Sequence, residues 1–344
     1  MGKRSKVRTR VRLSDVAEAA GVSINTASRA LTGKRDVSER TRASVLAVAE
    51  RMGYTPNALA RSLVQRQTKT IGLIVTDATH DFYSPIIRTI EETVSAEGFS
   101  LLLATSTGDT EKEQRAVATM KERCVDGILF TAVNVDAPHV LSTLSDARVP
   151  IVLLTRWPRS YDGLLVTIDN VEGARLAIRH AVNLGHSRIA IVSRFGTDQN
   201  PELRAKGWAE ELQAHGMNLD ESMMIKAEST IDGGRGAVPW LLRRTPRPTA
   251  VVTYSDVQAV GVISGLLEAG VRVPQDISVI GFDDVPLATL VSPKLTTVSQ
   301  RIGEIGRIGA DLLISRIRQT AIENEQVVLV PELVPRDSSG PAPD

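Results

Sequence analysis

The sequence is poor in the residue types on which secreted scaffolds, metal sites and membrane proteins depend. It contains one cysteine, Cys124, so no disulfide can form within the chain, and its five histidines show no ligand spacing. No apolar run approaches the ~18 residues needed to span a membrane. The basic N-terminus lacks the apolar stretch of a secretory signal. These absences predict a cytoplasmic protein without a metal site or cofactor.

Sequence patterns of common enzymes are missing as well. Glycines occur in GVISGLLEAG and GEIGRIGAD, but neither run places G-x-G-x-x-G after a strand, and there is no Walker-A pattern. A G-x-S-x-G nucleophile elbow and a cluster of metal ligands are absent too. We therefore expect no enzymatic activity.

Positive charge is concentrated at one end of the chain. The net charge of the 344 residues is only +1, but residues 1–70 carry 15 Lys and Arg against 5 Asp and Glu. The remainder carries 26 basic against 35 acidic residues. A basic head on an acidic body predicts that the head binds a polyanion such as nucleic acid.

Residues 13–31 predict two short helices joined by a tight turn. Ser14 and Ser23 are placed to cap the two helices, and Gly21 supplies the permissive backbone between them. The second helix begins with small or polar residues at 24–26 and buries small apolar ones. This arrangement is typical of the DNA-binding helix-turn-helix, although the segment alone also fits an ordinary helical hairpin.

Two further helical segments follow this pair. Ser38 is placed to cap a longer helix over residues 39–52, which ends at Gly53. Residues 55–63 favour one more helix of about two turns, and a polar segment follows it at 65–70. Isolated helices of that length are marginal in water, so we expect this one to be ordered only when docked.

The rest of the chain alternates short β-branched runs with amphipathic stretches, from residue 71 to about 320. This texture predicts parallel sheets covered by helices on both faces, a doubly wound α/β architecture. Some 260 residues exceed one such sheet, so we expect two lobes with a cleft. The expected helices are Pro85–Gly98, Glu111–Arg123, Val171–Leu184, Ala205–Gly216, Val257–Gly270 and Ile302–Arg318.

Several motifs, in order along the chain, resemble the LacI/GalR family of bacterial transcription regulators. They are LSDVAEAAGVSINTASRALTG, VSERTRASVLAVAERMGYTPNALARSL, TKTIGLIV, CVDGILF, VTIDNVEGARLAIRHAVNLGHSRIAIV, LRAKGW, PTAVVTYSDVQAVGV, VPQDISVIGFDD and LTTVSQ. The resemblance implies a three-helix head, a hinge helix and a two-lobed core like periplasmic binding proteins. It also implies three crossovers between lobes, near Asp169, near Val298 and near residues 322–326.

These observations divide the chain into four parts. The head with its basic arm spans 1–54, the hinge helix and linker 55–70, the effector-binding and dimerisation core 71–337, and a Pro- and Gly-rich flexible tail 338–344.

The resemblance assigns base reading to Ile24, Asn25 and Arg29. The chemistry is suitable, because Asn binds adenine bidentately, Arg binds guanine, and Ile contacts a thymine methyl. Arg29 could instead clamp a phosphate. The hydroxyls better suited to phosphates are those of Ser23, Thr26, Ser28, Ser38 and Thr41.

The same resemblance places hinge helices of two subunits in the minor groove. Leu63 matches the residue that wedges the central base step, and small neighbours allow close approach of the two helices. Those neighbours are Asn57, Ala58 and Ala60. Alternatively, Leu63 anchors a linker on the body.

An effector is expected between the lobes. Arg204 and Asp256 match ligand-binding positions of the family. The family also contacts ligand in the loop after the first strand, which here contains Asp77, Phe82 and Tyr83. Two further positions come from placement alone, because ligands bind at the carboxyl ends of parallel strands. They are Arg156 with Trp157, and Asp283. Surface or packing roles fit each of these loop residues as well.

Taken together, these residues predict a homodimeric, sequence-specific regulator, a repressor that binds a pseudo-palindromic operator and responds to a sugar or sugar derivative. A corepressor-dependent regulator that responds to a purine or another metabolite is the alternative. Two rivals fit less well. A sugar transport protein has no use for the basic head, and a non-specific DNA binder has no use for a ligand-sized body.

Overall fold

The computed structural model describes most of the chain. The described residues are 11–31, 36–55, 67–131, 137–144, 149–158, 161–196 and 198–343. The chain divides into two compact units, Met1–Thr68 and Lys69–Asp344. No helix in these ranges is long and apolar enough to cross a membrane.

The first unit contains three helices around a small core. They are α1 (Leu13–Ala19), α2 (Ile24–Leu31) and α3 (Glu39–Met52). The core consists of small and β-branched side chains, namely Val16, Ala17, Ala27, Ala30, Val37, Val45, Val48 and Ala49. Such short side chains allow three short helices to pack closely, as the helix-turn-helix interpretation requires.

Two of the three expected helix caps are present. Ser23 Oγ accepts the Thr26 N–H at 3.0 Å, and Ser38 Oγ accepts the Thr41 N–H at 3.2 Å. The expectation for Ser14 is wrong, because α1 already begins at Leu13 and Ser14 lies inside its first turn. The carboxylate of Asp15 instead accepts the backbone N–H of Arg12, at 2.9 Å.

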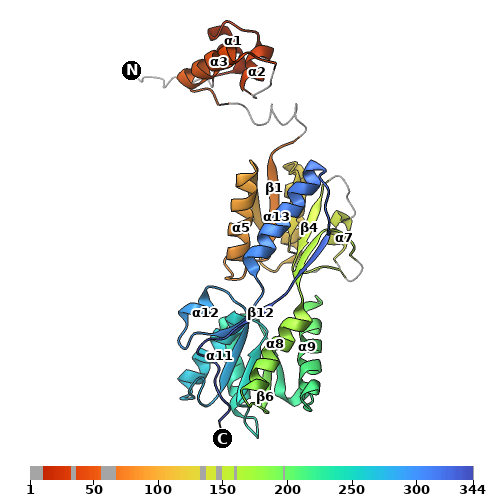
Figure 1. Ribbon diagram of the computed structural model, residues 1–344, viewed down its shortest axis with the longest axis vertical. Helices are drawn as coiled ribbons and strands as arrows, with labels where there is room; N and C mark the ends of the chain where they lie inside the picture. Colours follow the sequence, from red (N-terminus) through yellow and green to blue (C-terminus); the bar gives the residue numbers. More distant parts are fainter. Residues whose placement is uncertain are drawn as a thin grey trace, which may run out of the picture. The chain divides into compact units, whose positions relative to one another are not determined.

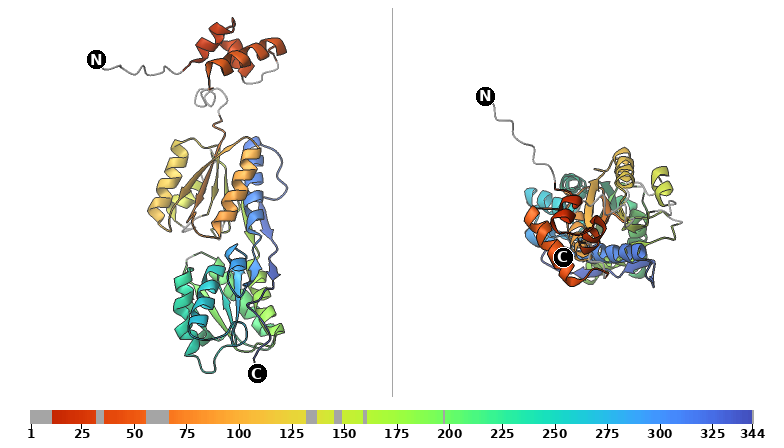
Figure 2. Two further views of the ribbon diagram at one scale, coloured as in Figure 1. Left: turned by 90° about the vertical axis from the view of Figure 1, so that its left-hand side faces the viewer. Right: turned by 90° about the horizontal axis from the view of Figure 1, so that it is seen from above.

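The second unit contains two parallel-sheet lobes, and helices cover both faces of each sheet (Figures 1 and 2). In the first lobe the strand order is β11-β5-β4-β3-β1-β2, and all neighbours are parallel. The strands are β1 (Thr70–Val75), β2 (Ser100–Thr105), β3 (Gly127–Phe130), β4 (Ile151–Leu154), β5 (Leu165–Ile168) and β11 (Gln326–Leu329). Its helices are α5 (Tyr83–Ala96), α6 (Thr110–Glu122), α7 (Pro138–Leu144) and α13 (Ile302–Arg318).

The second lobe repeats this order as β12-β10-β9-β8-β6-β7, with only the β10–β12 pair antiparallel among the described strands. Its strands are β6 (Ile189–Arg194), β7 (Met224–Ala227), β8 (Ala250–Thr253), β9 (Ser278–Asp283), β10 (Thr296–Ser299) and β12 (Glu332–Val334). Its helices are α8 (Asn170–Asn183), α9 (Asn200–Ala214), α10 (Ile231–Leu242), α11 (Asp256–Glu268) and α12 (Leu287–Leu290), and a short 3₁₀ turn spans Glu221–Met223. The order of strands reverses between β1 and β3 in one sheet and between β6 and β8 in the other.

The chain crosses between the lobes three times, so each lobe is discontinuous in sequence. The first crossing, at Asp169 between β5 and α8, is where we expected it. The second follows β10, at Gln300 and Arg301, close to the expected Val298. The third lies between β11 and β12, at 330–331, and not at 322–326, because β11 pairs with β5 in the first lobe before the chain leaves it.

The C-terminal residues are packed on the second lobe, which contradicts the flexible tail expected for 338–344. Ser338 is fully buried; its hydroxyl donates to Val279 O at 2.6 Å and accepts the Thr296 N–H at 2.8 Å. The Ala342 N–H then bonds to Leu184 O at 2.8 Å. The Pro- and Gly-rich composition of this segment misled us, because its backbone groups bond to the lobe without forming a regular element.

Candidate functional site

In the first unit, the N-terminal turn of α2 presents the side chains that the sequence assigned to base reading. Ile24 is 55% exposed, so its side chain is free to contact a base edge. Asn25 beside it is exposed. Arg29, one turn further on, forms an ion pair with Asp36, and its side chain remains 52% exposed.

Four of the five hydroxyls assigned to phosphates lie at helix N-termini. Ser23 and Thr26 share a hydrogen bond of 2.8 Å at the start of α2, and Ser38 and Thr41 share one of 2.8 Å at the start of α3. The positive end of each helix dipole lies there, which favours a phosphate. Ser28 is half-buried. All five assignments stay predictions, and Asn57, Ala58, Ala60 and Leu63 lie outside the described residues.

In the second unit, a cavity of about 230 Å³ lies between the lobes. Its wall in the first lobe follows β1 and β4 and consists of Thr76, Asp77, His80, Phe82, Tyr83, Thr155 and Arg156. Its wall in the second lobe follows β6, β7, β8, β9 and β10 and consists of Arg194, Asn200, Arg204, Glu228, Ser229, Thr230, Tyr254, Ser255, Asp283 and Gln300. The cavity thus occupies the carboxyl ends of strands in both sheets, including both points where the strand order reverses, which is where such sheets bind ligands.

Arg204 is held rigidly in the second-lobe wall. It is 2% exposed; its Nε donates to Asn170 Oδ1 at 3.0 Å, and Nη1 donates to Tyr254 O. The guanidinium carbon lies 4.1 Å from the centre of the Tyr254 ring and 3.5 Å from that of Phe282. Burial lowers its pKa, but an arginine stays charged. The side chain is therefore a fixed, buried cation.

Asp283 lies in the same wall and accepts a hydrogen bond from Gln300 Nε2. Burial raises its pKa to about 8, with Arg204 opposing and Asp256 adding to the rise. Burial therefore favours the protonated form of this carboxyl. Such a group can donate a hydrogen bond as well as accept one.

Asp256 does not line this cavity, although the sequence grouped it with the ligand contacts. It is fully buried behind the wall, where its carboxylate accepts the Val285 N–H at 2.9 Å and the Thr297 hydroxyl at 2.5 Å. Burial raises its pKa to about 6. These bonds hold the turn at Asp283 and Asp284, so Asp256 supports a cavity residue and does not contact the cavity itself.

Trp157 is also outside the cavity, although its neighbour Arg156 lines it. The Trp157 ring packs on the core of the first lobe, and its carbonyl accepts Gln199 Nε2 at 3.0 Å. Asn200 Nδ2 donates to Thr155 O at 3.2 Å beside it. Trp157 therefore belongs to a contact between a first-lobe loop and a second-lobe loop.

Asp198 strengthens that contact between the lobes. It forms ion pairs with Arg194 of its own lobe and with Arg156 of the first lobe, the latter at 3.8 Å. Burial alone would raise the pKa of Asp198, but the two guanidinium groups hold it below its usual range. Asp198 is thus a buried anion shared by two cavity arginines.

Sequence reasoning missed several cavity residues. Arg194 ends β6 and Tyr254 follows β8, so the strand-end rule that selected Arg156 and Asp283 could have selected both. Residues 228–230 follow β7, a short strand whose sequence, MIKA, gave no signal. Gln300 follows β10 and ends the family motif LTTVSQ, which did not single it out as a ligand contact.

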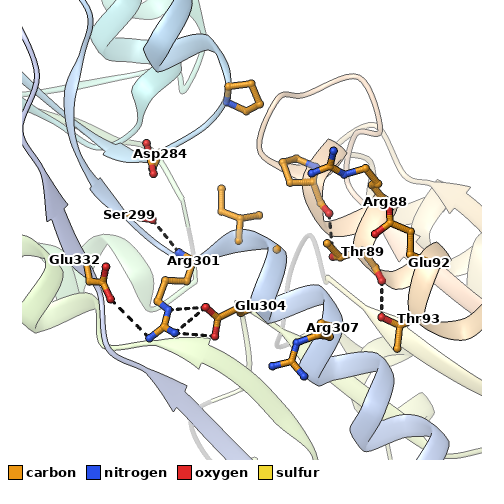
Figure 3. A pocket seen from close by; sticks show the side chains of 14 residues that line it. Arg88, Thr89, Glu92, Thr93, Asp284, Ser299, Arg301, Glu304, Arg307 and Glu332 are labelled. Carbon is orange, nitrogen blue, oxygen red and sulfur yellow. Dashed lines mark hydrogen bonds and ion pairs between the residues drawn. The ribbon is translucent and has the colours of Figure 1, made fainter. Parts of the chain in front are cut away.

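A second, larger cavity of about 720 Å³ lies between α5, the start of α13 and the turn at Asp284 (Figure 3). Several of its charged groups are already paired: Arg301 donates to both carboxylate oxygens of Glu304 at 2.7–2.9 Å, and Arg307 pairs with Asp311 at 3.1 Å. Arg336 bonds to Asp284 at 2.6 Å. Because these pairs satisfy one another, the smaller cavity at the strand ends is the better ligand site.

Comparison with known proteins agrees with this division of roles. Residues 12–57 match the family described as bacterial regulatory proteins, lacI family, and residues 178–339 match a periplasmic binding protein-like domain. The chain is 36% identical to the ribose operon repressor of Escherichia coli K12, over 95% of this chain and 99% of that protein.

Two solved structures are similar over most of the fold. The lac repressor dimer bound to operator and the anti-inducer ONPF has a TM-score of 0.86 and 26% identity, over 96% of this chain and all of that one. A LacI family regulator from Enterococcus faecium with bound ribose has a TM-score of 0.70 and 29% identity, over 79% and 99% of the two chains. The chain belongs to the LacI family of bacterial regulatory proteins.

Proposed function

We propose that the chain is a cytoplasmic transcriptional repressor that binds an operator as a homodimer and releases it when a small carbohydrate occupies the cavity between the lobes. The observation that carries this proposal is the cavity, which lies at the strand ends of two lobes and is lined by fixed polar groups. The α2 surface supplies the DNA-reading residues Ile24, Asn25 and Arg29.

The proposed mechanism uses the position in the sequence of the hinge helix and linker, 55–70, which follows the three-helix head and precedes the two lobes. A ligand changes DNA affinity only as far as it binds one arrangement of the body better than another. If closure around a sugar separates paired hinge segments of a dimer, their marginal helices lose support and Leu63 leaves the minor groove. A coupling of about 1–3 kcal/mol, or roughly 5–150-fold in affinity, is typical of such linkage.

A sugar fits better than the corepressor alternative. The ribose operon repressor and the Enterococcus faecium structure with bound ribose both name a sugar. The polar wall also offers carboxyl, guanidinium and amide groups, which match the many hydroxyls of a carbohydrate.

Footprinting tests the proposal. The full chain is incubated with fragments of its own genomic neighbourhood, with and without each member of a panel of sugars. We expect a protected pseudo-palindrome that at least one sugar abolishes. Arg29→Ala should relax base preference in each half-site, and Arg12→Ala should weaken all DNA binding alike. Protection that no sugar changes, or equal base preferences for the two variants, would count against the proposal.

A further inference from the structure

Arg194 is a cavity residue whose bonding is incomplete. It is 9% exposed at the end of β6, its Nη1 donates to Phe195 O at 2.8 Å, and its Nη2 bonds to Asp198. Its Nε–H is buried and has no hydrogen-bond partner among the described residues. A guanidinium group has five N–H donors, and the bonds to Phe195 and Asp198 use only part of them. Because Arg194 lines the cavity, a ligand there can supply a further acceptor.

A second fixed cation lies close to it. The guanidinium carbons of Arg194 and Arg204 lie 4.7 Å and 4.1 Å from the centre of the same Tyr254 ring. Burial raises the pKa of the neighbouring carboxyl, Asp283, to about 8, which favours its neutral form. The buried carboxylate of Asp198 offsets one charge, but it is shared between Arg194 and Arg156 of the first lobe. This part of the cavity therefore holds more cationic than anionic groups.

The acidic groups of the cavity lie elsewhere. Asp77 belongs to the first-lobe wall, where bonds from the Thr79 hydroxyl and N–H keep its pKa low, and Glu228 is exposed in the second lobe. Carboxylates accept hydrogen bonds from hydroxyls, whereas guanidinium groups prefer oxyanions. The cavity thus offers carboxylates for the hydroxyls of a ligand and guanidinium groups for an anionic group.

From this arrangement, and building on the proposed function, we infer that the effector is a monosaccharide bearing an oxyanion, which Arg194 and Arg204 bind. The volume of about 230 Å³ is below the 300–1,000 Å³ typical of drug-sized ligands, which favours one sugar ring over two. A carboxylate and a phosphate share the chemistry that these arginines recognise, so a sugar acid and a sugar phosphate are both within the inference.

Calorimetry on the full chain with matched pairs of sugars tests this inference. The pairs are D-galactose with D-galacturonate and D-ribose with D-ribose 5-phosphate, and they separate carboxylate from phosphate. We expect the anionic member of at least one pair to bind about tenfold or more tightly than its neutral partner. Raising the salt concentration should weaken only the anionic member.

Variants identify the residue responsible. Arg194→Met should reduce the ratio of the anionic to the neutral affinity to within about threefold, whereas Arg194→Lys should keep part of the preference because it keeps the charge. Arg272→Met, which removes an exposed arginine paired with Asp276, is the matched control and should change neither affinity.

Two results would overturn the inference. One is equal or tighter binding of the neutral sugars, and the other is an anion preference that Arg194→Met leaves intact. If a neutral sugar binds and releases the operator, the inference fails and the proposed function stands. If no sugar of either kind binds or alters operator binding, both fail.

Discussion

The two walls of the interlobe cavity are built differently. In the second lobe, Arg204 and Asp283 are at least 95% buried and are fixed by hydrogen bonds to Asn170 and Gln300. In the first lobe, Asp77, Phe82 and Arg156 are only half-buried, and they lie in loops after β1 and β4. One wall is therefore rigid before any ligand arrives, and the other is more open to solvent.

This difference indicates how the cavity would divide its work. A wall whose side chains are already ordered binds without a further loss of conformational entropy, so it can supply most of the affinity. A half-exposed wall gains contacts with the ligand only when the lobes close, so its contacts favour the closed arrangement of the lobes. We expect substitutions in the second lobe to abolish binding and substitutions in the first lobe to weaken it.

Arg204→Met should have the largest effect. It removes the buried cation and leaves Asn170 Oδ1 and Tyr254 O without their donor, so we expect effector affinity to fall by 100-fold or more. Urea unfolding should show a loss of about 2–4 kcal/mol. Arg272→Met, the exposed-arginine control used above, should cost under about 1 kcal/mol and leave effector binding intact. If Arg204→Met bound the effector like the wild type, the ordered second-lobe wall would not supply most of the affinity.

Asp256→Asn tests support from behind the wall. Asp283 and Asp284 have φ angles of 130° and 61°, conformations that cost about 1–3 kcal/mol each and need outside support. The amide can keep the bond from the Thr297 hydroxyl but would place a donor against the Val285 N–H. We expect about tenfold weaker effector binding with operator affinity unchanged. Unchanged effector binding would show that the turn holds without Asp256.

The raised pKa of Asp283 predicts that the stability of the chain depends on pH. Its pKa is about 8 in the folded chain and near 3.8 when unfolded, so between about pH 4 and pH 8 the folded chain holds the extra proton. Raising the pH through this window therefore favours unfolding. The side chain of Asp283→Asn carries no titrating proton, so the free energy of unfolding of this variant should fall less between pH 5 and pH 8 than that of the wild type, by about 3–4 kcal/mol. Parallel pH profiles would show that Asp283 is ionised.

Phe82→Ala should have the smallest effect. Its ring is half-buried and meets Tyr83 edge to face, with ring centres 5.2 Å apart. Phe82 also lines the cavity, and the contact of one aromatic ring with a ligand contributes about 0.5–1.5 kcal/mol, so effector affinity should fall about threefold to tenfold in calorimetry. A loss as large as that of Arg204→Met would remove the distinction between the walls.

The sequence predicted the fold well where local patterns decide it. The bounds of α3 and of α13 agree with the expected ranges, because a cap or an amphipathic period marks them. Helix α10 was missed because Gly233, Gly234, Gly236 and Pro239 argue against a helix. These glycines are explained by tertiary packing. A Cβ on Gly234 would lie 2.0 Å from the carbonyl oxygen of Gln258 in α11, so only glycine allows the two helices to pack this closely.

The cavity was predicted less completely. Strand ends and family motifs located Arg204 and Asp283, because position in the fold alone brings them to the cleft. They could not separate Asp283, which lines the cavity, from Asp256, which supports it, because both are acidic residues near strand ends. Only the hydrogen bond from the Val285 N–H to Asp256 shows that Asp256 supports the turn after β9, whereas Asp283 lines the cavity.

The most direct test measures operator affinity by fluorescence anisotropy at fixed salt, with and without the sugar that binds most tightly in calorimetry. We predict that the sugar lowers the affinity of the wild type by roughly 5–150-fold. Arg204→Met should bind the operator like the wild type in the absence of sugar and should not respond when sugar is added. An operator affinity that stays constant while calorimetry shows the cavity occupied would contradict the account, as would a full response by Arg204→Met.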